Sequence, residues 1–292
     1  MLNYFTMNPQ ILDGRKLATK FDEQLSKRIG LLKTAGIIPG LAILLKEGDK
    51  ESAIFVRQKE KKCELLGIEV VIETLPKEGF LENATKIVAR WNENPKMHGI
   101  VVQVPRGDAS EMREVIKLVD PKKDVDCLHP ENIGLLSFSK PRFLPPTPAG
   151  IHQLLIKNKI NFDGKHVVII GRGNLVGKPL ALLLLQKKKD ANATVTVCHR
   201  HTKDLAKHTK QADILVVAIG QKEFIGKEYI NKGCVLVDVG IHKVGDNWFG
   251  DVKHSEVDKL VSAVTPVPGG VGPMTVTMLL SNVILSAENL LA

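Results

Sequence analysis

The segment 166–179 constrains the fold of this chain most strongly. His166 and four apolar residues (HVVII, 166–170) run directly into a turn that carries Gly171, Gly173 and Gly177. A strand followed by a glycine-rich turn and a helix lets backbone N–H groups approach a pyrophosphate closely. The spacing, G-x-G-x-x-x-G, is one residue longer than the common dinucleotide fingerprint. The segment therefore predicts a nucleotide-binding α/β fold, and the alternative is a tight turn without a ligand.

Both halves of the chain alternate between strand and helix patterns. Helical periodicity in the first half covers 13–35, 51–66 and 81–92. Short apolar runs that read as strands occupy 40–45, 68–73, 99–104, 193–197, 214–219 and 235–239. Alternation of this kind predicts parallel sheets covered by helices. The fold class is therefore α/β, with an N-terminal α/β domain and a second, Rossmann-like domain.

A proline-rich segment, LPPTPAG (144–150), is the predicted joint between the domains. The length of 292 residues suits about two domains. We expect the first domain to hold residues 1–148 and the second to hold 149–273. The apolar helical stretch near the C-terminus has little to pair with locally, so residues 274–292 are expected to complete the first domain. The chain would then cross the boundary twice.

Composition narrows the classes of partner. Lys and Arg outnumber Asp and Glu by 41 to 32, which favours anionic partners. Aromatic residues make up only 4% and no dense basic stripe occurs, so a nucleic-acid surface is not expected. No apolar run reaches the ~20 residues of a membrane span, and the N-terminus lacks the pattern of a signal peptide. Four cysteines without a C-x-x-C pair, and histidines without metal-ligand spacing, favour a cytoplasmic protein without a metal site.

The residues after the second strand of the Rossmann-like half favour NADP over NAD. A strand at this position usually ends with an acidic residue that binds the ribose 2′-hydroxyl of NAD. Here the strand is followed by Cys198, His199, Arg200 and His201, with no carboxylate. Arg172 and Arg200 could both reach a 2′-phosphate. The alternative is that they are two solvated loop arginines.

The helix predicted over 51–66 places Phe55, Lys59 and Cys63 along one face, at i, i+4 and i+8. Spacing alone favours a plain interpretation, in which the lysine stem lies along an apolar face and its head reaches solvent. Other segments change that interpretation.

Five segments occur in a specific order along the chain. They are SAIFVRQKEKKC (52–63), GIVVQVP (99–105), PKKDVD (121–126) with HPENIG following, GRGNLVGKP (171–179) and TPVPGGVGPMT (265–275). Together they resemble the bifunctional methylenetetrahydrofolate dehydrogenase/methenyltetrahydrofolate cyclohydrolase family. The resemblance extends from LDGR (12–15) to the terminal helix.

The resemblance implies an enzyme that oxidises 5,10-methylenetetrahydrofolate with NADP and hydrolyses the methenyl product to 10-formyltetrahydrofolate. It implies a folate cleft between a catalytic domain and an NADP-binding domain, polyglutamylated folates as substrates, and a homodimer. Lys59 matches the catalytic lysine, Gln103 the residue that tunes it, and Asp126 the aspartate that holds the pteridine. Further implied folate contacts are Phe55, Val102, Val104, Pro268, Gly269, Gly270, Val271 and Gly272. Implied NADP contacts are Gly171, Arg172, Gly173, Val176, Gly177, Arg200 and Ile241.

Elementary chemistry agrees with these implied roles. Hydride transfer needs mainly alignment of donor and acceptor. Attack of water on the cationic methenyl group needs a proton acceptor. A lysine beside a cationic substrate in a partly desolvated site is pushed towards its neutral amine, which can act as a base. Gln103 is uncharged, so it can orient that amine without fixing it as the ammonium.

Several positions depart from the family pattern. Phe55 stands where tyrosine is usual, so a hydroxyl that would assist hydrolysis is missing. Cys127 replaces a common glycine, Arg106-Gly107 replaces Leu-Pro, and Arg200-His201 replaces serine followed by a basic residue. These departures leave two alternatives open, a dehydrogenase with weak or lost cyclohydrolase activity and a non-catalytic folate- or NADP-binding protein.

Two other dehydrogenase classes fit less well. A short-chain dehydrogenase needs a tyrosine hydroxyl four residues before its lysine, and Phe55 has none. A shikimate-type dehydrogenase shares the order of domains but does not explain TPVPGGVGPMT.

Overall fold

The computed structural model describes residues 8–48, 50–104 and 110–291. The chain divides into two compact units. The six-stranded unit holds the residues up to Ala18 together with Thr147–Thr275. The three-stranded unit holds Thr19–Pro146 and the residues from Val276 onward. The division falls inside helices α1 (Gly14–Thr34) and α10 (Val271–Glu288), so each helix contributes residues to both units.

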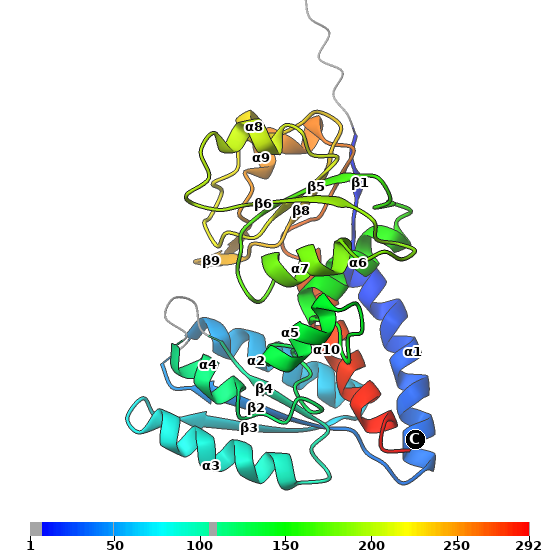
Figure 1. The fold of residues 1–292 in the computed structure, drawn as a ribbon, viewed down its shortest axis with the longest axis vertical. Helices are drawn as coiled ribbons and strands as arrows, with labels where there is room; N and C mark the ends of the chain where they lie inside the picture. Colours follow the sequence, from blue (N-terminus) through cyan, green and yellow to red (C-terminus); the bar gives the residue numbers. More distant parts are fainter. Residues whose placement is uncertain (1–7, 49, 105–109, 292) are drawn as a thin grey trace, which may run out of the picture. The chain divides into compact units, whose positions relative to one another are not determined.

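The six-stranded unit is built on a parallel sheet in the order β1-β11-β8-β7-β5-β6 (Figure 1). Its strands are β1 (Gln10–Ile11), β5 (His166–Ile170), β6 (Thr194–Cys198), β7 (Ile214–Val217), β8 (Val235–Asp238) and β11 (Ala263–Val264). Its helices are α6 (Pro146–Lys157), α7 (Gly177–Leu184), α8 (Leu205–Thr209) and α9 (His254–Val257), with 3-10 turns at Lys227–Tyr229 and Asp258–Leu260. A short antiparallel hairpin is made by β9 (His242–Val244) and β10 (Asn247–Phe249).

Both faces of this sheet are covered, which is why its strands read as continuous apolar runs. Val167 and Ile169 pack with residues of α6 and α7 in one cluster. Val168 and Ile170 point to the other face and pack in a second cluster that includes Val257 of α9. The strand with the strongest sequence signal therefore lies between two hydrophobic layers.

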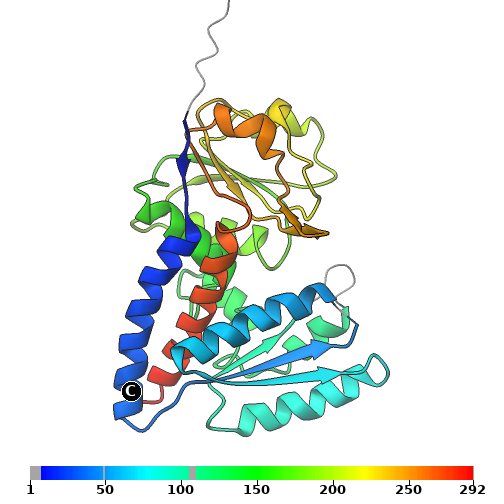
Figure 2. The ribbon, with the colours of Figure 1, turned by 180° about the vertical axis from the view of Figure 1, so that it is seen from behind.

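The three-stranded unit has a parallel sheet in the order β3-β2-β4 (Figure 2). Its strands are β2 (Gly40–Lys46), β3 (Glu69–Leu75) and β4 (Gly99–Val102). Its helices, besides most of α1 and α10, are α2 (Lys50–Leu66), α3 (Phe80–Glu93), α4 (Ser110–Ile116) and α5 (Pro130–Ser137).

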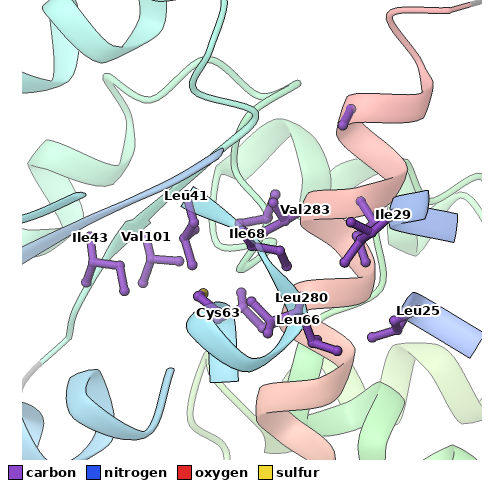
Figure 3. Close-up of a cluster of buried hydrophobic side chains, with 14 of the residues drawn as sticks. Leu25, Ile29, Leu41, Ile43, Cys63, Leu66, Ile68, Val101, Leu280 and Val283 are labelled. Atoms are coloured by element: carbon purple, nitrogen blue, oxygen red, sulfur yellow. The ribbon is translucent and has the colours of Figure 1, made fainter. Parts of the chain in front are cut away.

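Alternate residues of β2 pack into two separate cores. Leu41, Ile43 and Leu45 contribute to a cluster that Figure 3 shows, together with Cys63 of α2 and Leu280 and Val283 of α10. Ala42 and Leu44 belong to the opposite cluster with α3, whose Phe80, Ala84, Val88 and Trp91 are buried at helical spacing. Helix α2 therefore covers one face of the sheet and α3 the other (Figures 1 and 2).

The structure agrees with the expected α/β class and corrects several details. The residues up to Ala18 belong to the six-stranded unit, because Gln10 and Ile11 pair with Ala263 and Val264. The chain consequently passes between the units three times. The expectation that the first domain begins at residue 1 is therefore wrong. The segment 144–150 is only partly a joint, since α6 begins at Pro146 and proline is well suited to the first turn of a helix.

Two predicted element ends also shift. The strand expected over 99–104 ends at Val102, and the terminal helix begins at Val271, earlier than expected. Val271 and Gly272 are therefore the first helical residues after the glycine loop. The expected contribution of this helix to the three-stranded unit is large: Leu279, Leu280, Val283, Ile284 and Ala287 lie in its core.

One helix within the described ranges, α10, is long and apolar enough to cross a membrane by length and composition alone. Most of it, 61% of its apolar window, is buried inside the fold. Core helices satisfy the same criterion, and the packing of α10 accounts for its composition.

Candidate active site

Lys59 lies on α2 with only 9% of its surface exposed. Its Nζ donates a hydrogen bond of 2.7 Å to Oε1 of Gln103. The plain interpretation, in which the ammonium head reaches solvent, is therefore wrong. Phe55, one turn earlier, is partly buried, and Cys63, one turn later, is in the core. Phe55, Lys59 and Cys63 thus lie along one face of the helix, as predicted, and Lys59 is the polar residue between two less polar ones.

Burial disfavours the charged form of Lys59. Loss of hydration lowers the pKa of Lys59 below its ordinary value, and the nearby Asp126 and Cys63 oppose that effect only in part. Burial also raises the pKa of Asp126, against the opposing effect of Lys59. The same loss of hydration raises the pKa of Cys63 to about 12, so this thiol is inert at neutral pH. The arrangement favours an amine that can accept a proton.

Gln103 is positioned by the end of the central sheet. Strand β4 stops at Val102, and the backbone N–H of Gln103 still donates to the carbonyl of Leu44 at 2.9 Å. The side chain of Val102 is in the core beside α3, so only its backbone is available to a substrate. Val104 is half-buried against the same core. The altered pair Arg106-Gly107 lies outside the described residues.

Asp126 follows Asp124, a buried residue for which the sequence predicted no role. Asp124 accepts hydrogen bonds from Nδ2 of Asn132 and from the backbone N–H of His129, both at 2.8 Å. Burial raises the pKa of Asp124, and these hydrogen bonds oppose the change. Nδ2 of Asn282, on α10, donates to the carbonyl of Val125 at 2.8 Å. The loop that carries Asp126 is thus held from both sides.

Only some of the residues that hold the Asp126 loop could be predicted from the sequence. Asp124 and Asn132 lie within the quoted PKKDVD and HPENIG segments, but their pairing needs the fold. Asn282 had no signal at all. Cys127 adopts a left-handed conformation with φ 57°, which glycine reaches without strain and which fits the glycine that the resemblance implies at this position. Its thiol donates to the carbonyl of Phe143 at 3.4 Å.

The glycine turn after β5 lies where the order of the sheet reverses, because β6 joins β5 on one side and β7 on the other. In open α/β sheets ligands bind at such a switch point. A Cβ on Gly171 would lie 2.1 Å from the carbonyl oxygen of Ala218, and one on Gly177 would lie 1.9 Å from that of Gly171. A Cβ on Gly173 would meet nothing within 4 Å. Gly171 and Gly177 are therefore required for close packing of the backbone, whereas Gly173 leaves an open face on the turn.

The open face suits a dinucleotide phosphate. Gly177 begins α7, with Val176 at its N-cap, so the helix N-terminus adjoins the turn. Arg172 and Arg200 are both exposed after neighbouring strands. Partial desolvation lowers the pKa of His199, and the positive charge of Arg172 and the neighbouring His201 add to the effect. The two arginine-bearing loops thus gather positive charge at one edge of the sheet.

The predicted loop over Pro268–Gly272 belongs to the six-stranded unit, as does Ile241, which follows β8. The backbone N–H of Gly270 donates to the carbonyl of Pro266 at 2.8 Å, and that of Arg15 donates to Gly269 at 3.0 Å. Lys59, Gln103, Asp126 and Phe55 belong to the three-stranded unit. The predicted residues therefore form two groups, one on each unit. Across the three described ranges no cluster of His, Cys, Asp or Glu is suited to a metal ion.

Comparisons with known proteins identify both units. Residues 12–126 match the family model described as tetrahydrofolate dehydrogenase/cyclohydrolase, catalytic domain. Residues 145–291 match the model described as the NAD(P)-binding domain of the same family. The Bifunctional protein FolD of Halalkalibacterium halodurans is 43% identical over 97% of this chain and 100% of its own length.

Solved structures of the same family resemble this chain over nearly its whole length. The bifunctional enzyme FolD from Campylobacter jejuni has a TM-score of 0.90 at 39% identity, covering 96% of this chain and 99% of that one. The FolD of Trypanosoma brucei, solved with NADP cofactor and an inhibitor, has a TM-score of 0.90 at 34% identity, covering 97% and 98%.

These comparisons confirm the predicted two-domain α/β fold and the predicted enzyme, and they do not favour the dehydrogenase-only and non-catalytic alternatives. The chain belongs to the tetrahydrofolate dehydrogenase/cyclohydrolase family.

Proposed function

We propose that this chain oxidises 5,10-methylenetetrahydrofolate to the methenyl form with NADP and hydrolyses that product to 10-formyltetrahydrofolate. The observation that carries the proposal is the buried Lys59 amine, bonded to the uncharged Gln103 at 2.7 Å, in a chain of this family. A solvated lysine would remain protonated at neutral pH, whereas burial makes this one a usable base.

For the oxidation, the chain's main task is alignment. NADP supplies the acceptor for the hydride that leaves the methylene carbon. Gly171, Gly173, Val176, Gly177 and Ile241 would hold the dinucleotide, and Arg172 and Arg200 would contact its 2′-phosphate. Hydride transfer between aligned carbons needs little proton transfer, so no acid or base is assigned to this step.

For the hydrolysis, Lys59 acts as general base. Water adds to the cationic methenyl carbon while the neutral amine takes up one of its protons. The bond from that carbon to N5 then breaks, N5 gains a proton, and the carbon remains on N10 as a formyl group. One proton is released overall. Gln103 orients the amine through its Oε1, and Asp126 holds the pteridine. Phe55, the backbone of Val102, Val104 and the loop Pro268–Gly272 complete the folate contacts.

The remaining expectations are part of the same proposal. All four cysteines are buried and free of disulfides, which suits a reducing compartment such as the cytoplasm. We propose a homodimer, which light scattering of the purified chain would test by a mass twice that of one chain. The basic surplus suits folates with a polyglutamate tail. Comparing the KM values of mono- and polyglutamylated substrates would test that preference.

One assay tests the two activities separately. The purified chain receives methylenetetrahydrofolate with NADP or NAD, and the reduced nicotinamide and the methenyl product are followed as separate signals. We expect reduced cofactor to form with NADP, and added methenyltetrahydrofolate to be hydrolysed. Lys59→Met should abolish hydrolysis while folate binding changes much less. Hydrolysis at the wild-type rate in that variant would remove Lys59 from the mechanism, and no turnover by the wild type would refute the proposed function.

A further inference from the structure

Two wholly buried carboxylates lie at the carboxyl edge of the six-stranded sheet. Asp238 is the last residue of β8, and Asp251 follows β10. Their exposed fractions are 2% and 0%. Buried carboxylates are costly unless they are fully hydrogen-bonded, so their partners indicate what they are for.

Asp251 holds the loop that follows β7. Its Oδ2 accepts hydrogen bonds from the backbone N–H groups of Ile219 and Gly220, at 2.8 and 2.9 Å. Its Oδ1 lies 2.8 Å from Nε2 of His242, and because a carboxylate only accepts, the imidazole donates. One side chain thus fixes two consecutive peptide groups of one loop and the first residue of the β9–β10 hairpin.

Asp238 in turn holds the chain around Asp251. Its Oδ1 accepts from the backbone N–H groups of Gly240 and Asp251, at 2.9 and 3.0 Å. Its Oδ2 accepts from that of Val252 at 3.0 Å. A Cβ on Gly240 would lie 2.3 Å from the carboxylate of Asp251, so glycine is needed for this approach. The two carboxylates form one connected clamp.

The clamp reaches the nucleotide turn through Ala218. The N–H of Ala218 donates to the carbonyl of Ile170 at 2.8 Å, and its own carbonyl oxygen abuts Gly171. The residues that Asp251 holds, Ile219 and Gly220, come next in the chain. They lie at the carboxyl end of β7, which with β5 forms the switch point of the sheet.

We propose that Asp251 is a positioning residue for NADP, which fixes the 218–220 loop in its binding conformation without touching the cofactor. The inference rests on the proposed function, specifically on NADP binding at this switch point. A carboxylate is suited to the task because it offers two acceptor oxygens to three donors. Without it, cofactor binding would have to order the loop, and affinity would fall by that cost.

The test uses the full chain with Asp251→Asn and Asp251→Ala. Asparagine keeps one acceptor oxygen for the loop, so we expect it to weaken NADP binding by roughly tenfold, and alanine to weaken it more. Hydrolysis of methenyltetrahydrofolate should keep its kcat in both variants, because Lys59 and Gln103, which are assigned to this reaction, belong to the other unit. Asp213→Asn is the matched control: Asp213 Oδ2 accepts the N–H of His166 at 2.9 Å, at the amino end of the same sheet.

An unchanged NADP Kd in Asp251→Asn, accompanied by a lower thermal midpoint, would overturn the inference, because the clamp would then be merely structural. An equal loss of NADP affinity in Asp213→Asn would overturn it as well. If the alanine variant fails to fold, the asparagine variant decides. Failure of the wild type to bind NADP would be a different result, since it would refute the proposed function itself.

Discussion

Nζ of Lys59 and Oε1 of Gln103 are 2.7 Å apart, so the base candidate has an acceptor beside it that carries no charge. Gln103→Glu would place a carboxylate at the same point with almost the same shape. The new charge should raise the pKa of Lys59, which burial now lowers, by roughly one to three pH units. Because the neutral amine is the proposed active form, the rising limb of the cyclohydrolase pH–rate profile should move to higher pH by that amount.

The dehydrogenase profile of the same variant is the control, since hydride transfer does not use the amine. A cyclohydrolase profile that loses amplitude without moving along the pH axis would contradict the assignment of Lys59 as base.

Phe55→Tyr tests the most informative departure from the family pattern. Phe55 lies one turn before Lys59 on α2 and is partly buried. A restored hydroxyl should assist the hydrolytic step by about one hydrogen bond, which corresponds to a two- to tenfold rise in the cyclohydrolase kcat. The dehydrogenase kcat should stay level, so the ratio of the two activities is the quantity to measure. An unaltered ratio would mean that the hydroxyl has no part in hydrolysis here.

Asp126→Asn should show that the buried Asp126 carboxylate lowers the free energy of unfolding in a pH-dependent way. Burial raises the pKa of Asp126, so the folded state binds its proton more tightly than the unfolded state. The Asp126 carboxyl makes its full contribution to stability below the ordinary pKa of about 4. This contribution is lost as the pH rises through the pKa that the carboxyl has in the folded state. Asparagine is neutral throughout, so the variant's gain in free energy of unfolding should grow with pH over that window.

Denaturant unfolding at several pH values would measure this gain. Asp246→Asn, in the exposed turn of the β9–β10 hairpin, is the control variant. A gain that is constant with pH would argue that the Asp126 carboxyl titrates normally.

The sequence could predict the elements that are long enough to show a clear pattern of apolar residues. Strand β5 and helix α3 bury residues at the spacing that their patterns indicate. Strands β1 and β11 are two residues each, too short for any period, and their pairing moved the N-terminal segment into the other unit. Pro146 reads as a joint because proline breaks helices, yet it begins one, since the first turn needs no N–H from it.

The site divides in the same way. Lys59, Gln103 and Asp126 could be proposed because each stands in a quoted motif. Asn282 and Asp251 could not, because their partners at Val125 and Ile219 are far away in sequence. Hydrogen bonds of this range leave no local pattern, and only the fold brings their atoms together.

Arg200→Ser tests the preference for the phosphorylated cofactor. Arg200 is exposed after β6, and a bidentate guanidinium–phosphate contact is a strong charge-assisted interaction. Its loss should weaken the preference for NADP over NAD by about tenfold or more, mostly through a higher KM for NADP. The KM for NAD, which lacks the 2′-phosphate, should stay the same. If both values of kcat/KM fall together, the arginine supports the loop and does not read the phosphate.

Gly14→Ala tests whether the glycine loop contacts folate. Gly14 begins α1, and a Cβ there would lie 1.8 Å from the carbonyl oxygen of Gly270. Because the N–H of Arg15 also donates to Gly269, the added methyl group must push the loop away from its anchor. The folate KM should therefore rise about tenfold in both reactions, which corresponds to about 1.4 kcal/mol of lost binding.

Gly30→Ala, on the same helix, is the matched control, because a Cβ there meets nothing within 4 Å. It should leave both KM values unchanged and stabilise the fold by roughly 0.5–1 kcal/mol, as expected for alanine in a helix interior. The comparison separates helix propensity from the position of the loop. If Gly14→Ala binds folate as tightly as Gly30→Ala, the 268–272 loop is not a folate contact.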